Sequence, residues 1–182
     1  MNKFIITILW CTTLIACNSN KDKIGKVKSM YDILESAEEI VEQVDTGEAF
    51  SAHREIKQKL LFIQKNYPDT IDKPSALFIG DVHSMRKILT HFKESREEFE
   101  EEIEYSKEQL EDMISDLEEN KMPADKFNEY YQTEMDAILD LNTRVQRATN
   151  NTLNSLEKYK DGKAKLDSII NGIKAAIDTT QT

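Results

Sequence analysis

The chain has 182 residues, of which 39% are hydrophobic and 32% are charged, and its formal net charge is −10. Five glycines and three prolines leave few turn residues, which disfavours an all-β sandwich or barrel, because such folds need a turn roughly every 8–12 residues. The excess of acidic residues disfavours nucleic-acid binding, which requires Lys and Arg to neutralise phosphates. The composition favours one all-α domain built from amphipathic helices over a disordered chain.

The first apolar stretch of the chain is too short to be a membrane span. Residues 4–16 carry no charge and follow Lys3. A helix needs about 20 residues to cross a bilayer, so these residues instead match the apolar core of a signal peptide.

The stretch ends in Leu14-Ile15-Ala16-Cys17, which resembles the lipobox of bacterial lipoprotein signal peptides. Leucine lies three positions before the cysteine, and a small residue lies directly before it. In that family the chain is cut before the cysteine, which then carries the acyl chains, palmitate among them. The resemblance implies that residues 1–16 are a signal peptide, that Cys17 is the lipidation site, and that the lipid anchors the protein to the membrane.

An ordinary secretory signal and an N-terminal anchor that is not removed are the alternatives to a lipoprotein signal. Cys11 would leave with the signal peptide, so the mature chain would contain no free thiol and no disulfide. In lipoproteins of Gram-negative bacteria, Asp directly after the cysteine tends to retain the protein at the inner membrane. Asn18 occupies that position here, so the resemblance favours the outer membrane, facing the periplasm.

After a polar tether at residues 17–23, apolar residues recur at steps of three and four, which marks helices with one apolar face. The first such face consists of Val27, Met30, Leu34, Ala37, Val41 and Val44. We expect one helical domain over residues 24–182, with helices at about 24–45, 48–67, 75–119 and 123–178. Gly162 leaves open whether residues 163–178 continue the fourth helix or form a fifth.

The third helix carries the longest regular pattern. From Phe78 to Leu117, apolar residues alternate steps of four and three with only Arg96 and Ser106 as polar members, which predicts a coiled-coil seam. Folding the chain at residues 120–122 would place Ile103 near Ile138 and Val82 near Tyr159.

These lengths predict an antiparallel long-helix bundle of four or five helices. At 1.5 Å per residue the third helix is roughly 60 Å long, about twice the length of either of the first two. Residues 94–146 would therefore project as an acidic two-helix coiled-coil arm. The connections would place Cys17 at the bundle end and the turn at Lys121 at the distal tip.

Acidic charge concentrates in the predicted arm, where residues 94–119 hold 13 acidic residues against Arg96 and Lys107. We expect a solvated face that keeps the helix soluble, while docking of a cationic protein partner and weak divalent-cation binding stay open. The candidate partner-binding residues are Glu97, Glu98, Glu101, Glu104, Tyr105 and Tyr130.

The remaining polar residues give little sign of chemistry. Arg96 on the seam is expected to set register or to mark the edge of the arm, with anion binding as the alternative. His83 and His91 lie eight residues apart, too far for a metal pair on one helix face, and no Glu-x-x-His repeat occurs. We therefore expect no metal and no cofactor.

The sequence thus favours a non-enzymatic lipoprotein of the cell envelope that acts as a helical scaffold or adaptor for protein partners. A periplasmic holding chaperone and a ligand-binding helical bundle are the alternatives. The oligomeric state stays open.

Overall fold

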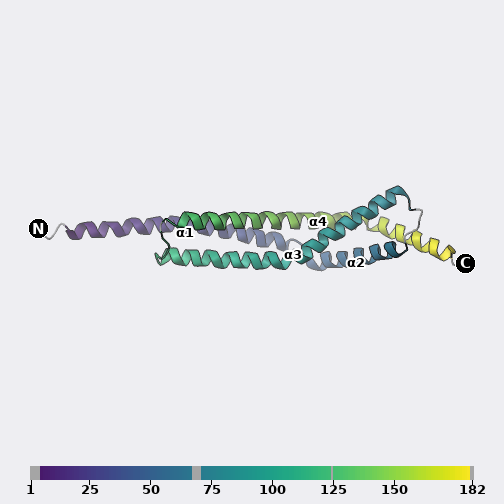
Figure 1. Ribbon diagram of the computed structural model, residues 1–182, viewed down its shortest axis with the longest axis horizontal. Coiled ribbons are helices and arrows are strands. Elements are labelled where there is room, and N and C mark those ends of the chain that lie inside the picture. Colours follow the sequence, from purple (N-terminus) through teal and green to yellow (C-terminus); the bar gives the residue numbers. More distant parts are fainter. Residues whose placement is uncertain (1–4, 67–70, 124, 181–182) are drawn as a thin grey trace. The chain divides into compact units, whose positions relative to one another are not determined.

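The computed structural model describes residues 5–66, 71–123 and 125–180, with the backbone alone for 5–19 and 180. Within these ranges the chain forms four helices and no strand: α1 (Ile5–Glu42), α2 (Thr46–Lys65), α3 (Lys73–Glu118) and α4 (Phe127–Thr180) (Figure 1). The predicted all-α bundle is confirmed. α4 continues past Gly162, so the alternative of a fifth helix is wrong.

Aspartates set the starts of two helices slightly earlier than the apolar pattern predicts. The side chain of Asp45 accepts a hydrogen bond from the Glu48 N–H at 3.0 Å, and that of Asp72 accepts one from the Ser75 N–H at 3.0 Å. Each carboxylate satisfies a backbone donor that has no partner within the first helical turn. α2 and α3 therefore begin at residues 46 and 73 rather than at 48 and 75.

The turn between α3 and α4 is longer than expected because it contains its own hydrogen bonds. Asn120 adopts a left-handed backbone with φ of 56°, and the Lys121 N–H donates to the carbonyl of Asp116 at 2.8 Å. This arrangement closes the carboxyl end of α3. The Lys126 N–H then donates to the Pro123 carbonyl at 3.0 Å, so α4 begins at Phe127 and not at residue 123.

The helices divide between two compact units. Unit 1 comprises Met1–Glu39 and Phe99–Arg144, and therefore contains most of α1, the last part of α3 and the first part of α4. Unit 2 comprises Ile40–Glu98 and Val145–Thr182, and contains α2, the first part of α3 and the rest of α4.

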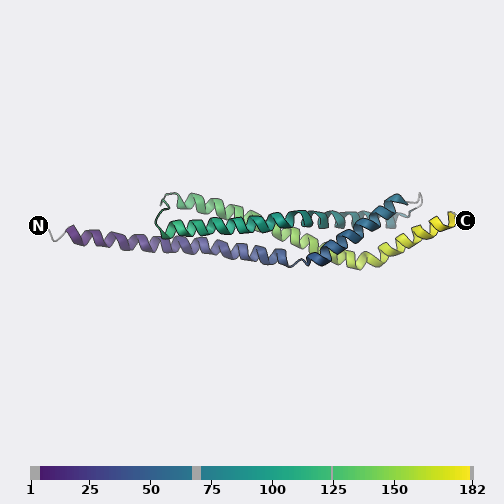
Figure 2. The same ribbon diagram turned by 90° about the horizontal axis from the view of Figure 1, so that it is seen from below.

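In unit 1, α1 runs antiparallel to α3, as both ribbon views show (Figures 1 and 2). The side chain of Asn20 donates to the Leu117 carbonyl at 3.0 Å. Farther along α1, the Tyr31 hydroxyl donates to the Lys107 carbonyl at 2.9 Å. Val27, Met30 and Leu34 on α1 are completely buried.

The predicted two-helix arm is therefore wrong, because α1 packs along residues 99–144 as a third helix. A two-helix arm would leave much of its apolar seam in water, and the apolar stripe of α1 covers that seam instead. The expected polarity is wrong as well, since Asn20 lies at the α3–α4 turn and not far from it. Residues 17–23, expected as a tether, belong to α1. The side chain of Cys17 lies outside the described residues.

In unit 2, α3 and α4 pair in the predicted antiparallel register. A Cβ atom on Gly162 would lie 2.9 Å from Cζ of Phe78, which is one helical turn beyond the expected pairing of Val82 with Tyr159. Val82 and Tyr159 are both buried. The ring of Phe78 thus occupies the space that a side chain at position 162 would need.

This close approach gives a prediction with a matched control. Alanine favours a helix interior over glycine by about 1 kcal/mol, and a Cβ on Gly172 would meet nothing within 4 Å. We expect Gly172→Ala to stabilise the protein by about 0.5–1 kcal/mol, and Gly162→Ala to destabilise it by about 1 kcal/mol because the Phe78 ring must move. Urea unfolding of both variants measures the difference. Equal stabilisation by both would contradict the packing of Phe78 on α4.

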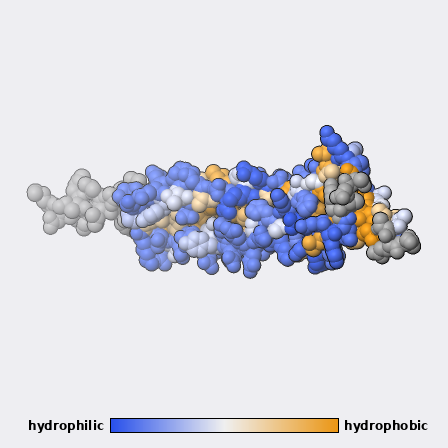
Figure 3. Space-filling model, turned by 45° about the vertical axis from the view of Figure 1, so that its right-hand side comes forward, coloured by the Kyte–Doolittle hydropathy of each residue, from blue (hydrophilic) through white to orange (hydrophobic). Residues whose placement is uncertain are grey.

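The outer surface is mostly hydrophilic on the face that Figure 3 shows, and apolar side chains gather near the end of α4. Two large apolar side chains of unit 2 are well exposed: Leu61 near the end of α2 at 54%, and Leu77 near the start of α3 at 63%.

Candidate functional site

The candidate partner-binding residues are exposed, but they lie in both units. Tyr105 on α3 and Tyr130 on α4 belong to unit 1 and are 63% and 47% exposed. Of the acidic candidates, Glu101 and Glu104 belong to unit 1, and Glu97 and Glu98 belong to unit 2. Partner binding at these six residues stays a prediction.

Part of the acidic stretch faces α1. Burial raises the pKa of the Tyr31 phenol to about 12, and the nearby carboxylates of Glu111 and Glu104 add to the shift. The ammonium group of Lys107 lies 2.7 Å from a carboxylate oxygen of Glu38, and this contact raises the pKa of Lys107. The carboxylate of Glu38 on α1 thus pairs with one of the two basic residues in the acidic stretch of α3.

Arg144 on α4 supplies a cation that the sequence analysis missed. Its guanidinium pairs with Glu102 on α3, and its Nε donates to Asp140 at 2.9 Å. The guanidinium carbon lies 5.8 Å from the ring centre of Phe99. These carboxylates, Glu102 first, raise the pKa of Arg144. The helical spacing of Asp140 and Arg144, together with the hairpin register, was the available signal.

Of the three histidines, His53 makes a hydrogen bond between helices, and His83 and His91 are exposed. Nε2 of His53 lies 3.0 Å from the Thr90 hydroxyl oxygen. That hydroxyl donates to the Arg86 carbonyl, so its oxygen accepts a hydrogen bond from the Nε2–H of His53. Burial and the charge of Lys93 lower the pKa of His53. Across the described residues, no group of three or more His, Cys, Asp and Glu side chains could hold a metal ion.

An ion cluster joins α2 to α4 in unit 2, and we call Glu55, Lys59, Lys163 and Asp167 the α2–α4 cluster. The ammonium group of Lys59 lies 2.7 Å from Glu55 and 2.6 Å from Asp167. Lys163 lies 2.8 Å from the other oxygen of Glu55. The Glu55–Lys59 spacing of four residues was visible in the sequence, but its partners on α4 were not.

Burial and neighbouring charges shift the pKa values of this cluster in opposite directions. Burial alone would raise the pKa of Glu55, but hydrogen bonds from Lys163 and Lys59 outweigh it and hold that pKa at about 2. Burial alone would lower the pKa of Lys59, but Asp167 and Glu55 raise it above its ordinary value. Burial raises the pKa of Tyr159 beside them to about 12, and Glu55 contributes. The cluster holds α2 against α4.

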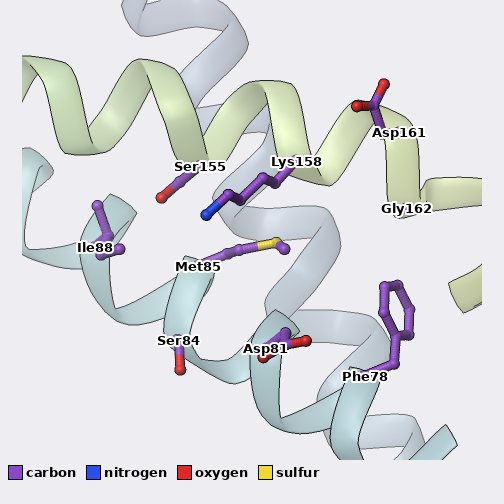
Figure 4. Close-up of a pocket in the computed structure, with 9 residues that line it drawn as sticks. All are labelled: Phe78, Asp81, Ser84, Met85, Ile88, Ser155, Lys158, Asp161 and Gly162. Carbon is purple, nitrogen blue, oxygen red and sulfur yellow. The ribbon is translucent and has the colours of Figure 1, made fainter. Parts of the chain in front are cut away.

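A groove of about 510 Å³ lies between α3 and α4 in unit 2 (Figure 4). Lys158 extends between Ser155 and Met85, and Phe78 lies below Gly162. The groove is open to water, because Lys158 and the other charged residues of its lining are exposed. A ligand-binding bundle would be expected to enclose its ligand, so this groove gives that alternative no support.

Asn20 and Lys23 on α1 contact the α3–α4 turn of unit 1 and the start of α4. The amide of Asn20 donates to the Leu117 carbonyl at 3.0 Å and to the side-chain oxygen of Asn120 at 2.9 Å. The ammonium of Lys23 lies 4.9 Å from the ring centre of Phe127. The last carbonyls of a helix lack partners within it, and Asn20 supplies one from α1. We call these five residues the α1–turn contact. This contact was not predicted, because Asn20 lies in the polar stretch that was expected to be a tether.

Comparison with protein-family models, curated proteins and solved structures gives no match to this chain. In the parts of the chain that the structure describes, no helix is both long enough and apolar enough to cross a membrane. What the protein does is therefore inferred from its own residues.

Proposed function

We propose that this protein is a lipoprotein of the bacterial cell envelope, anchored through acyl chains on Cys17. The observation that carries the proposal is the lipobox-like Leu14-Ile15-Ala16-Cys17 at the end of the uncharged stretch of residues 4–16. Asn18 after the cysteine favours the outer membrane, facing the periplasm, by the same resemblance.

We further propose that the helical part acts as a non-enzymatic scaffold or adaptor for protein partners. Two features support this role. Side chains such as Tyr105 and Tyr130 are exposed on long helices, and the groove between α3 and α4 is open to water. Tyrosine is enriched at protein interfaces. The excess of carboxylates on α3 favours a cationic partner.

Acylation can be tested by replacing each cysteine in turn. In bacterial cells fed an alkyne analogue of palmitate, we expect the unsubstituted protein and Cys11→Ser to carry the label and to partition into a detergent phase. Cys17→Ser should lose both properties, because it has no thiol at the cleavage site to accept the lipid. Label on Cys17→Ser, or an unlabelled unsubstituted chain, would contradict the proposal.

The adaptor role can be tested by photocrosslinking in intact cells. A photoreactive residue at Tyr105 or Tyr130 should form an adduct with a defined partner, and one at the exposed Lys57 on α2 should not. A protein that instead suppresses aggregation of unrelated unfolded proteins would be a holding chaperone, and that result would contradict an adaptor role.

A further inference from the structure

We infer that the α3–α4 turn, described at residues 119–123 and 125–126, is the pole of unit 1 that lies against the phospholipid headgroups. This inference rests on the proposed acylation of Cys17, and it reverses the orientation that the sequence pattern suggested.

The length of chain between the anchor and the turn carries the inference. Cys17 lies three residues before Asn20, and three residues span at most about 11 Å even when fully extended. The side chain of Asn20 is hydrogen-bonded to Asn120 in the turn and to Leu117 directly before it. A lipid on Cys17 must therefore hold the turn close to the membrane surface.

The charges at the turn are compatible with that position. Lys121 pairs with Glu119, and Lys126 lies 2.7 Å from Glu129, so two carboxylates there have a cationic neighbour. Lys121 and Lys126 remain 65% and 46% exposed. Exposed lysines near an anionic headgroup are attracted to it, which offsets the repulsion of the nearby acids.

The direction of α1 fixes what lies farther from the membrane. Contacts of α1 with α3 move from Leu117, at Asn20, to Lys107, at Tyr31. α3 ends at Glu118, so at 1.5 Å per residue Tyr105 lies about 20 Å from the turn along the helix. That separation exceeds the Debye length of about 8 Å at physiological ionic strength. With α3 directed away from the membrane, the acidic surface around Tyr105 lies outside the membrane's field and is open to a cationic partner.

Energy transfer from single labelled cysteines tests this orientation. The acylated protein, whose Cys17 is blocked by lipid, would carry Lys121→Cys or Tyr105→Cys with a fluorophore. It would be reconstituted in phosphatidylcholine vesicles containing an energy acceptor on the lipid headgroup. Both replaced side chains are exposed, so neither substitution opens the core. We expect several-fold more transfer from position 121 than from position 105.

Two failures can be told apart in the same preparation. If the unsubstituted chain carries no acyl group, the proposed function fails and this inference fails with it. If the protein is acylated and sediments with the vesicles, but position 105 transfers as much energy as position 121, the orientation alone is overturned. Cys17→Ser should show no transfer from either position, because it should not bind the vesicles.

Discussion

Leu34→Ala is expected to lower the free energy of unfolding by about 2–5 kcal/mol, the range found for buried leucines. Leu34 on α1 is completely buried in unit 1, and truncation leaves a cavity in addition to the lost burial. Leu61→Ala on α2 is the matched control, because Leu61 is 54% exposed and its truncation should cost less than about 1 kcal/mol. Urea unfolding of a chain that starts at residue 18 measures both values.

Hydrogen exchange locates the effect of Leu34→Ala within the chain. Since α1 packs on α3 and α4 in unit 1, amides in residues 99–118 and 127–144 should exchange faster in this variant. A self-sufficient two-helix arm would keep its protection when α1 is damaged. Unchanged exchange in both segments would therefore contradict the three-helix packing of unit 1.

Lys59→Met is expected to destabilise the protein by about 1–3 kcal/mol. The side chain of Lys59 is only 16% exposed, and its removal leaves Asp167 without this partner beside the core. This loss of stability is smaller than for a fully buried pair, because Asp167 is 45% exposed and solvent screens its charge. Lys160→Met is the control, since Lys160 and its partner Glu48 are 62% and 42% exposed, and we expect a much smaller change there.

The same variant should alter how stability depends on pH. The pKa of Glu55 is about 2 in the folded protein, against an ordinary value of 4.5. A lowered carboxyl pKa contributes stability above the ordinary value, and that contribution is lost as pH falls from about 4.5 to about 2. Lys59→Met removes one of the two lysines that lower this pKa, so its stability should fall less steeply across that range. An unchanged slope would contradict the pairing of Glu55 with Lys59.

The apolar periodicity of the sequence predicts the buried face of each helix well. All six residues of the first predicted apolar face, from Val27 to Val44, are buried, although Val44 follows the end of α1. On α3, Phe92, Ile103 and Leu110 are buried, and Arg96 and Ser106 are half-buried as the polar members of the seam. Burial follows the spacing because a helix has a single fixed period, so the sequence determines which side faces inward.

The periodicity could not predict which part of the α3–α4 pair α1 covers. An apolar stripe shows that a helix face must be buried, but it does not show which helix buries it. The stripe of α1 could therefore pack on either half of α3. Helix lengths favoured the wrong half. The deciding residue, Asn20, is polar and lies before the first apolar position, where the pattern predicts a tether. The clusters around Lys59 and Arg144 were missed for the same reason, since each depends on a partner from another helix.

Crosslinking between α1 and the turn tests the central claim, that α1 packs against the α3–α4 turn of unit 1 at Asn20. A chain that starts at residue 18 contains no natural cysteine. With Asn20→Cys and Asn120→Cys, a short bismaleimide should join the two positions within one molecule, because the native side chains lie 2.9 Å apart. Asn20→Cys with Tyr105→Cys should give no crosslink. A crosslink from position 20 to 105, or none to 120, would contradict this placement of α1.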